Sequence, residues 1–169
     1  MSPRLLACAL VLVLATQFGT TATHQVPDSC PVTKANQTSR FVPPSPYPKK
    51  TFPGNFWLGT DKLWTSLPKD GAWWGLRGYT TDDPTFRQKL FWWRAGYDWD
   101  TDRKPKLMVT GRRLDAPARP LHVDEPNSGT VHLNGSMIVT GVNFPTRGCW
   151  EVTGRYSGDE LTFVVWLGE

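Results

Sequence analysis

The stretch Pro145-Thr-Arg-Gly-Cys-Trp-Glu-Val-Thr-Gly-Arg-Tyr-Ser-Gly-Asp-Glu-Leu-Thr-Phe-Val-Val-Trp-Leu-Gly-Glu169 decides the fold class. It contains two apolar runs, Cys149 to Tyr156 and Leu161 to Leu167, on either side of the turn sequence Ser157-Gly158-Asp159. Two strand-like runs joined by a glycine-containing turn are typical of a β-hairpin. This stretch therefore predicts an antiparallel strand pair against which the upstream strands collect.

The parity of side chains in this hairpin predicts which of them are buried, because successive strand residues point to opposite faces. Cys149 and Trp166 have the outward parity, and we expect Cys149 to face away from the core. The apolar residues of the other parity should face the core: Trp150, Val152 and Tyr156 in the first run, and Leu161, Phe163, Val165 and Leu167 in the second.

Upstream of the hairpin, short apolar runs alternate with Gly, Pro and Asp clusters at spacings of roughly 8–15 residues, which is typical of a sandwich or barrel. Helical periodicity is limited to Asp83–Lys89, for which we predict a short helical turn. The sequence thus predicts an all-β domain over residues 55–169. The expected strands before the hairpin are Asn55–Leu58, Lys62–Leu67, Ala72–Tyr79, Gln88–Arg94, Lys106–Arg113, Leu121–Asp124, Thr130–Leu133 and Met137–Asn143.

The first residues have the pattern of a secretory signal peptide. Arg4 precedes an apolar run, Leu5 to Ala15, that is too short to span a bilayer, and small residues follow it. We predict a signal peptide over residues 1–23, cleaved near Ala22 or Thr23, and a secreted, periplasmic or cell-surface product without a membrane span. An uncleaved anchor is the alternative. A lipoprotein box at Cys8 fits less well, because the apolar core follows that cysteine.

Residues 24–54 form a proline-rich arm or linker. Within it, Phe41-Val-Pro-Pro-Ser-Pro-Tyr-Pro-Lys-Lys50 favours an extended polyproline II conformation over helix or central strand. A spacer is the preferred interpretation, and a ligand for a proline-recognising protein is the alternative.

Signal cleavage would leave two cysteines, Cys30 in the arm and Cys149 in the hairpin. An even pair in an exported chain predicts a disulfide bond, and two free thiols are the alternative. The outward parity of Cys149 favours a bridge to an outlying arm. Such a bridge closes a long loop and would stabilise the fold by roughly 4–5 kcal/mol in the chain-entropy model.

The charge balance excludes some classes of partner. Loss of Arg4 with the signal peptide takes the formal net charge from +4 to +3, and basic and acidic residues alternate along most of the chain. A small excess spread in this way does not indicate nucleic acid or an anionic membrane as the partner.

Tryptophan is the most unusual component, with nine in the chain, including the doublets Trp73-Trp74 and Trp92-Trp93. A doublet within a strand places one ring on each face of the sheet. Outward rings beside arginines could stack on sugars or other flat ligands. Alternatively, the rings cover one another or lie under the proline-rich arm. The candidate ligand-binding residues are Trp73, Trp92, Trp93, Arg94 and Arg113.

Catalytic and metal-binding patterns are sparse. His122 and His132 flank Pro126-Asn127-Ser128-Gly129, and a tight turn there would place them opposite each other as a candidate metal site. Two surface histidines without a metal are the alternative. No cofactor is expected. An enzyme would need a polar cleft built from Asp98, Asp100, Asp102, Arg113 and Asp115.

Three phrases carry a resemblance to known proteins. Lys89-Leu-Phe-Trp-Trp-Arg-Ala-Gly-Tyr97, Val109-Thr-Gly-Arg-Arg-Leu-Asp115 and Pro145-Thr-Arg-Gly-Cys-Trp-Glu-Val-Thr-Gly154 are similar to a family of exported bacterial proteins without an assigned activity. The closing hairpin also resembles the final strand pair of bacterial immunoglobulin-like domains, including copper-handling periplasmic ones. This second resemblance implies an immunoglobulin-like antiparallel β-sandwich.

Together these patterns predict an exported, non-enzymatic binding module with a cell-envelope protein or a polysaccharide as its partner. A carbohydrate-binding domain that uses exposed tryptophans is the first alternative. A periplasmic metal-binding protein and a hydrolase are the others.

Overall fold

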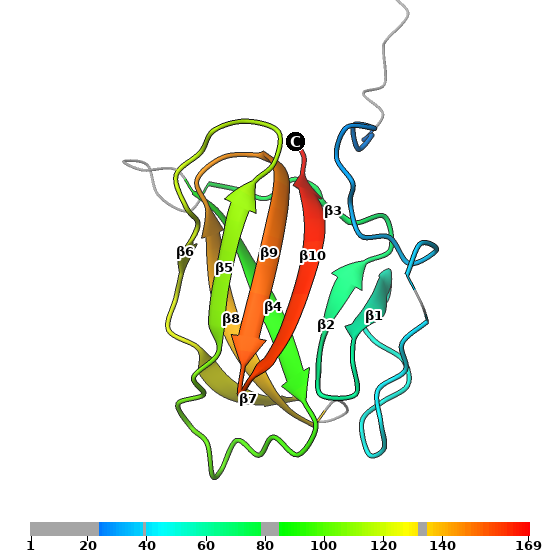
Figure 1. Ribbon diagram of the computed structural model, residues 1–169, viewed down its shortest axis with the longest axis vertical. Coiled ribbons are helices and arrows are strands. Elements are labelled where there is room, and N and C mark those ends of the chain that lie inside the picture. Colours follow the sequence, from blue (N-terminus) through cyan, green and yellow to red (C-terminus); the bar gives the residue numbers. More distant parts are fainter. Residues whose placement is uncertain (1–23, 39, 79–84, 132–134) are drawn as a thin grey trace, which may run out of the picture.

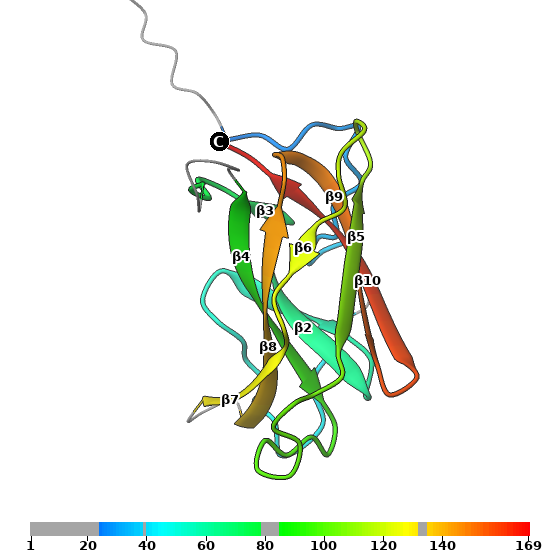
Figure 2. The ribbon, with the colours of Figure 1, turned by 90° about the vertical axis from the view of Figure 1, so that its left-hand side faces the viewer.

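The structure, a computed structural model, describes residues 24–38, 40–78, 85–131 and 135–169, so the predicted signal peptide lies outside the described residues. In these ranges there is no helix, and ten strands form two sheets packed face to face as a β-sandwich (Figures 1 and 2). The same ranges accordingly hold no helix long and apolar enough to cross a membrane. The predicted all-β sandwich is confirmed.

The first sheet has the order β1-β2-β4-β8-β6, with β7 also paired to β8, and all of these pairings are antiparallel. Its register places Trp64 opposite Trp93 and Leu90 opposite Thr140. Its strands are β1 (Asn55–Gly59), β2 (Leu63–Pro68), β4 (Phe86–Arg94), β6 (His122–Val123), β7 (Asn127–Val131) and β8 (Gly135–Phe144).

The second sheet has the order β3-β10-β9-β5 and is built on the predicted hairpin. The β9–β10 turn has positive φ at both Ser157 (51°) and Gly158 (87°), the conformation that suits a tight two-residue hairpin. β3 pairs with β10 in parallel, and the other pairings in this sheet are antiparallel. Its strands are β3 (Ala72–Trp73), β5 (Met108–Arg113), β9 (Gly148–Tyr156) and β10 (Asp159–Leu167).

The main core lies between the sheets and follows the predicted parity. Inward residues of β9 and β10 pack against Trp92 and its neighbours from the first sheet. A side chain at Gly154 would begin 2.4 Å from the Trp92 ring, so glycine leaves room for this indole. The Trp92 Nε1 donates to the Thr140 hydroxyl at 3.2 Å, which satisfies a polar group in the core. The buried hairpin residues are Trp150, Val152, Tyr156, Leu161, Phe163, Val165 and Leu167.

Two expected elements upstream of β5 differ in the structure. The expected helical turn at Asp83–Lys89 is wrong from Phe86 onward, where the chain is already in β4 and pairs with β8; its first two residues lie outside the described ranges. The expected strand Ala72–Tyr79 pairs with β10 only over β3. Gly75 has a positive φ of 65°, which turns the chain out of the sheet directly after Trp74.

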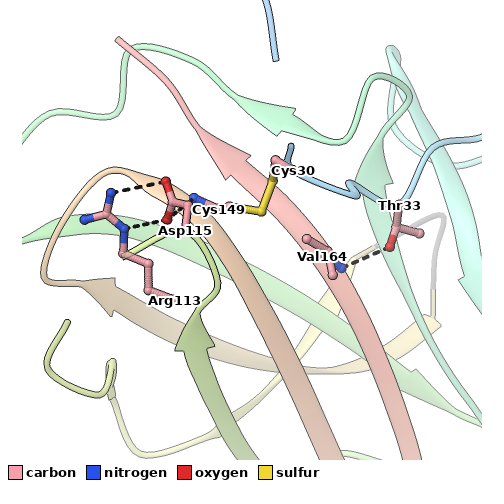
Figure 3. The surroundings of a disulfide bond; sticks show 6 residues. All are labelled: Cys30, Thr33, Arg113, Asp115, Cys149 and Val164. Carbon is pink, nitrogen blue, oxygen red and sulfur yellow. Dashed lines mark hydrogen bonds and ion pairs between the residues drawn. A yellow bond between two sulfur atoms is a disulfide. The ribbon is translucent and has the colours of Figure 1, made fainter. Parts of the chain in front are cut away.

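The arm lies on the sandwich and begins on the outer face of the second sheet. The Cys30–Cys149 disulfide is present, with its Cα atoms 5.6 Å apart, and Cys149 faces outward as predicted (Figure 3). Further along the arm, the Thr33 N–H donates to the Val164 carbonyl at 2.9 Å, and the Val164 N–H donates to the Thr33 hydroxyl at 3.0 Å. The first part of the arm is therefore fastened to both β9 and β10.

The second part of the arm covers the outer face of the first sheet. Tyr47 meets the buried Trp64 edge to face, with ring centroids 4.8 Å apart, and its hydroxyl donates to the Arg94 carbonyl at 2.8 Å. Phe52 lies against Phe91 and Trp93, 5.7 and 6.4 Å between ring centroids. The arm thus runs down one side of the sandwich beside β1 and β2 and packs against the outer face of each sheet (Figure 1).

Candidate functional site

The tryptophans expected to form a ligand surface are mostly interior. Trp92 and Trp93 do point to opposite faces, but both are 0% exposed, because Trp92 lies between the sheets and Trp93 lies under the arm. Trp73 is also buried in the main core. The expectation of a stacking platform on these three rings is therefore wrong, and the alternative of rings covered by the arm and by one another is confirmed for Trp93.

The two candidate arginines lie at opposite ends of the sandwich. The Arg94 guanidinium stands over the Tyr156 ring, 5.5 Å from its centroid, at the end of β9. Arg113 pairs in register with Trp150, near the start of β9. One ligand-binding surface containing both Arg94 and Arg113 is therefore excluded.

The candidate metal site is not formed as expected. β6 and β7 both pair with β8 instead of with each other, and Asn127, Ser128 and Gly129 belong to β7 rather than to a turn. His122 lies opposite Asn143 with its side chain 79% exposed, and His132 lies outside the described residues. Within the described ranges, no group of three or more His, Cys, Asp and Glu residues could hold a metal ion.

The acidic cleft required by the enzyme hypothesis is also divided between two ends. Asp102 accepts a hydrogen bond from the Tyr156 hydroxyl at the end of β9. Asp115 instead accepts one from the backbone N–H of Cys149 at 3.2 Å, near the start of that strand. The carboxylates preceding β5 and the Arg113–Asp115 pair following it therefore do not converge.

Tyr156 makes the fold sensitive to alkaline pH. Burial, followed by the hydrogen bond to Asp102, raises the pKa of Tyr156 from 10.0 to about 12. Unfolded Tyr156 loses its proton near its ordinary pKa while folded Tyr156 retains it, so the free energy of unfolding should fall as pH rises from 10 toward 12. We expect a loss on the order of 2 kcal/mol, measured by denaturant unfolding across this range. Tyr156→Phe should reduce the slope, and an unchanged slope would contradict this cause.

A recess of about 550 Å³ lies where β10 ends and β9 begins, next to the start of the arm. Two outward-facing tryptophans line it: Trp74, which follows the buried Trp73, and Trp166, whose outward parity the sequence predicted. Its lining includes the side chains of His24, Trp74, Arg113, Arg147, Trp166 and Glu169, and we call this site the Trp74 recess.

The Trp74 ring is held in place on several sides. Its Nε1 donates to the Asp70 carboxylate at 3.1 Å, and His24 meets the ring edge to face with centroids 4.9 Å apart. Gly168 passes beneath it so closely that an added Cβ would lie 2.1 Å from ring carbons. The half-buried indole therefore rests directly on the backbone after β10, and this close approach requires a glycine at position 168.

Arg113 is a largely compensated charge in the wall of the recess. Its Nε donates to one carboxylate oxygen of Asp115 at 2.7 Å and its Nη2 to the other at 3.2 Å (Figure 3). Its Nη1 donates to the Thr146 hydroxyl at 3.2 Å. The hydrogen bonds from Arg113 hold the pKa of Asp115 below its ordinary value. Gly148, at φ 131°, lets the guanidinium lie against the backbone, since a Cβ would be 2.6 Å from Nε.

Arg147 is better placed than Arg113 to bind an anionic ligand, because its own carboxylate partner is more exposed. Its guanidinium lies over the Phe86 ring, 4.5 Å from the centroid, and Nη2 donates to the Leu76 carbonyl at 3.4 Å. Its carboxylate partner is Glu169, at 3.6 Å from Nη1, and that side chain is 94% exposed. An exposed, loosely placed carboxylate can be replaced by a carboxylate on a ligand at little cost.

The geometry therefore favours binding of a flat molecule that carries an anionic group. Two indoles supply apolar faces, and a guanidinium supplies donors in a planar fork suited to a carboxylate. The parity of β10 predicted that Trp166 points outward, but Trp73 was the ring expected from the first doublet, and the structure buries it and places Trp74 in the recess. His24 and Arg147 were missed, because only the folded chain brings the arm and the β8–β9 connection to the same end.

Comparison with protein-family models, with curated proteins and with solved structures finds no match for this chain. The resemblance to exported bacterial proteins and to immunoglobulin-like domains stays a prediction.

Proposed function

We propose that this protein is an exported, non-enzymatic binding module that holds a carboxylate-bearing saccharide in the Trp74 recess. The observation that carries the proposal is the placement of Trp74 and Trp166 in one recess with Arg147, whose carboxylate partner Glu169 is exposed. Apolar walls with a few convergent polar groups are the usual composition of small-molecule sites.

Export is supported by the chemistry of the cysteines. The Cys30–Cys149 disulfide joins residues 119 positions apart in the chain, and such bonds persist in oxidising compartments. The signal-peptide pattern over residues 1–23 points to the same route. We propose a periplasmic, cell-surface or secreted location, where polysaccharides are available.

A sugar acid suits the recess better than a neutral sugar. The apolar face of a pyranose ring can lie on the Trp74 or Trp166 indole, while its carboxylate replaces Glu169 beside Arg147. A carboxylate–guanidinium pair with fork geometry adds orientation as well as attraction. The volume of about 550 Å³ lies within the size range of small-ligand sites.

The test is calorimetric titration with oligosaccharides that contain a uronic acid, compared with the same oligosaccharides after reduction of the carboxyl to an alcohol. We expect binding of the acidic form, and at least about tenfold weaker binding by Trp74→Ala and by Arg147→Gln, from loss of stacking and of the ion pair. Trp99→Ala is the matched control, because Trp99 is 37% exposed and lies outside the recess.

A third variant changes the shape of the recess without removing a contact group. Gly168→Ala should displace the Trp74 ring and weaken binding by a similar factor, with Arg147 intact. Equal binding of the acidic and reduced oligosaccharides would contradict the proposal that Arg147 binds the ligand carboxylate. Failure of a broad panel of acidic oligosaccharides to bind, with the oxidised protein folded, would overturn the proposal.

A further inference from the structure

A second concave surface lies between the arm and β1. It encloses about 600 Å³ and is lined by arm residues, by β1 and by Lys69 just after β2. β1 is the terminal strand of the first sheet in its pairing order, and Figure 1 shows the arm passing beside it. We call this surface the arm–β1 groove.

The charge of this groove is of one sign. Its lining contains the cations Arg40, Lys49, Lys50 and Lys69, all exposed, and no Asp or Glu. Within the described residues, none of these four makes an ion pair. Elsewhere arginines are matched with carboxylates, as in Arg112–Glu151 and Arg155–Glu160. The groove therefore gathers four exposed cations on one concave surface whose lining holds no carboxylate.

The groove is supported by contacts between the arm and the sheet close to its cations. The Thr51 hydroxyl lies 2.5 Å from that of Ser66, which ties the arm to β2 directly after Lys50. Phe52 packs on Phe91 and Trp93 beneath the same segment. Lys49 and Lys50 are thus presented from an anchored segment, and a ligand need not order the backbone that carries them.

We propose that the arm–β1 groove binds a strand of an anionic polysaccharide. Cations on the arm and Lys69 after β2 can contact successive acidic groups of a polymer, and Phe41, Phe56 and other aromatic residues of the lining can contact sugar faces. A concave surface fits a single strand better than the flat surface of a bilayer. The choice of a polysaccharide over nucleic acid rests on the export that forms part of the proposed function.

The experiment measures binding of the oxidised protein to polygalacturonate and to heparin, with dextran as the uncharged control. We expect binding to the acidic polymers that weakens as salt rises, because screening acts on exposed charges. The double variant Lys49→Ser/Lys50→Ser should bind about tenfold less tightly. The matched control Lys104→Ser/Lys106→Ser removes two exposed lysines outside the groove and should bind like the wild type.

The same measurements distinguish a specific polysaccharide site from nonspecific attraction, nucleic-acid binding and membrane binding. Equal weakening by both double variants would show nonspecific attraction and overturn the proposal, as would tighter binding to single-stranded DNA or to anionic vesicles than to either acidic polymer. Lys49→Ser/Lys50→Ser should leave the indole shifts of Trp74 and Trp166 on addition of a short uronic-acid oligosaccharide unchanged, because neither lysine lines that recess, so a failure of the Trp74 recess and a failure of this groove are distinguishable. Since the lysines are exposed, thermal unfolding of both double variants should match that of the wild type.

Discussion

Replacing both Cys30 and Cys149 with serine should lower the free energy of unfolding by about 4–5 kcal/mol, the largest loss that we expect from any change in the arm. The bond spans a sequence separation of 119, and its loss frees a large part of the unfolded chain from a constraint. The folded chain retains the Thr33–Val164 hydrogen bonds on the same face. Denaturant unfolding of the double variant and the oxidised wild type measures the difference.

The reduced wild type provides an independent comparison. A thiol reductant should bring its unfolding midpoint close to that of the Cys30→Ser/Cys149→Ser variant and should leave the variant unchanged. A difference below about 1 kcal/mol between variant and oxidised wild type would show that the disulfide does not secure the arm.

Trp64→Ala should have the second-largest effect, with a loss of about 3–5 kcal/mol. Trp64 is fully buried on the outer face of the first sheet, where Tyr47 meets it at 4.8 Å and Phe41 at 5.9 Å between ring centroids. Truncation leaves a cavity and removes the surface on which the arm rests. Denaturant unfolding gives the magnitude, and proteolysis near Tyr47 should accelerate because the arm is released.

The exposed Trp99 is the matched control for this change as well. Trp99→Ala should alter stability by less than about 0.5 kcal/mol, since an exposed ring loses little on truncation. Similar losses in Trp64→Ala and Trp99→Ala would contradict the view that the arm is an integral layer of the fold.

The closing hairpin could be predicted well because its information is local. Strand parity and a glycine-containing turn determine which side chains share a face, and the structure buries Trp150 and Phe163 while turning Cys149 outward. That outward position also explains why the bridge to Cys30 could be expected from the sequence. A short-range pattern was sufficient for both conclusions.

The failures concern pairings and coverage that depend on distant parts of the chain. The expected strands Leu121–Asp124 and Thr130–Leu133 were to pair with each other across a turn, but in the structure β6 and β7 both pair with the longer β8. Parity correctly placed Trp93 on the face opposite Trp92, yet it could not decide between solvent and the arm as the cover. The arm residues that decide this, including Phe52, are about 40 positions away in sequence.

The distribution of charge on the surface also could not be predicted from the net charge of the chain. The formal excess of +4 is small, and Arg40, Lys49 and Lys69 are separated by many residues. Folding brings them to one groove because the arm returns alongside β1. The same reasoning applies to Arg147, which lines one recess with Trp74 because the pairing of β9 with β10 places the β8–β9 connection beside the end of β10.

The most direct test of the Trp74 recess is nitrogen–proton NMR of the tryptophan indoles during titration with an acidic oligosaccharide. We predict that the indole signals of Trp74 and Trp166 shift progressively while that of the buried Trp92, bonded to Thr140, remains in place. Shifts of other indoles with those of Trp74 and Trp166 unchanged would contradict the account, as would unchanged spectra at saturating ligand.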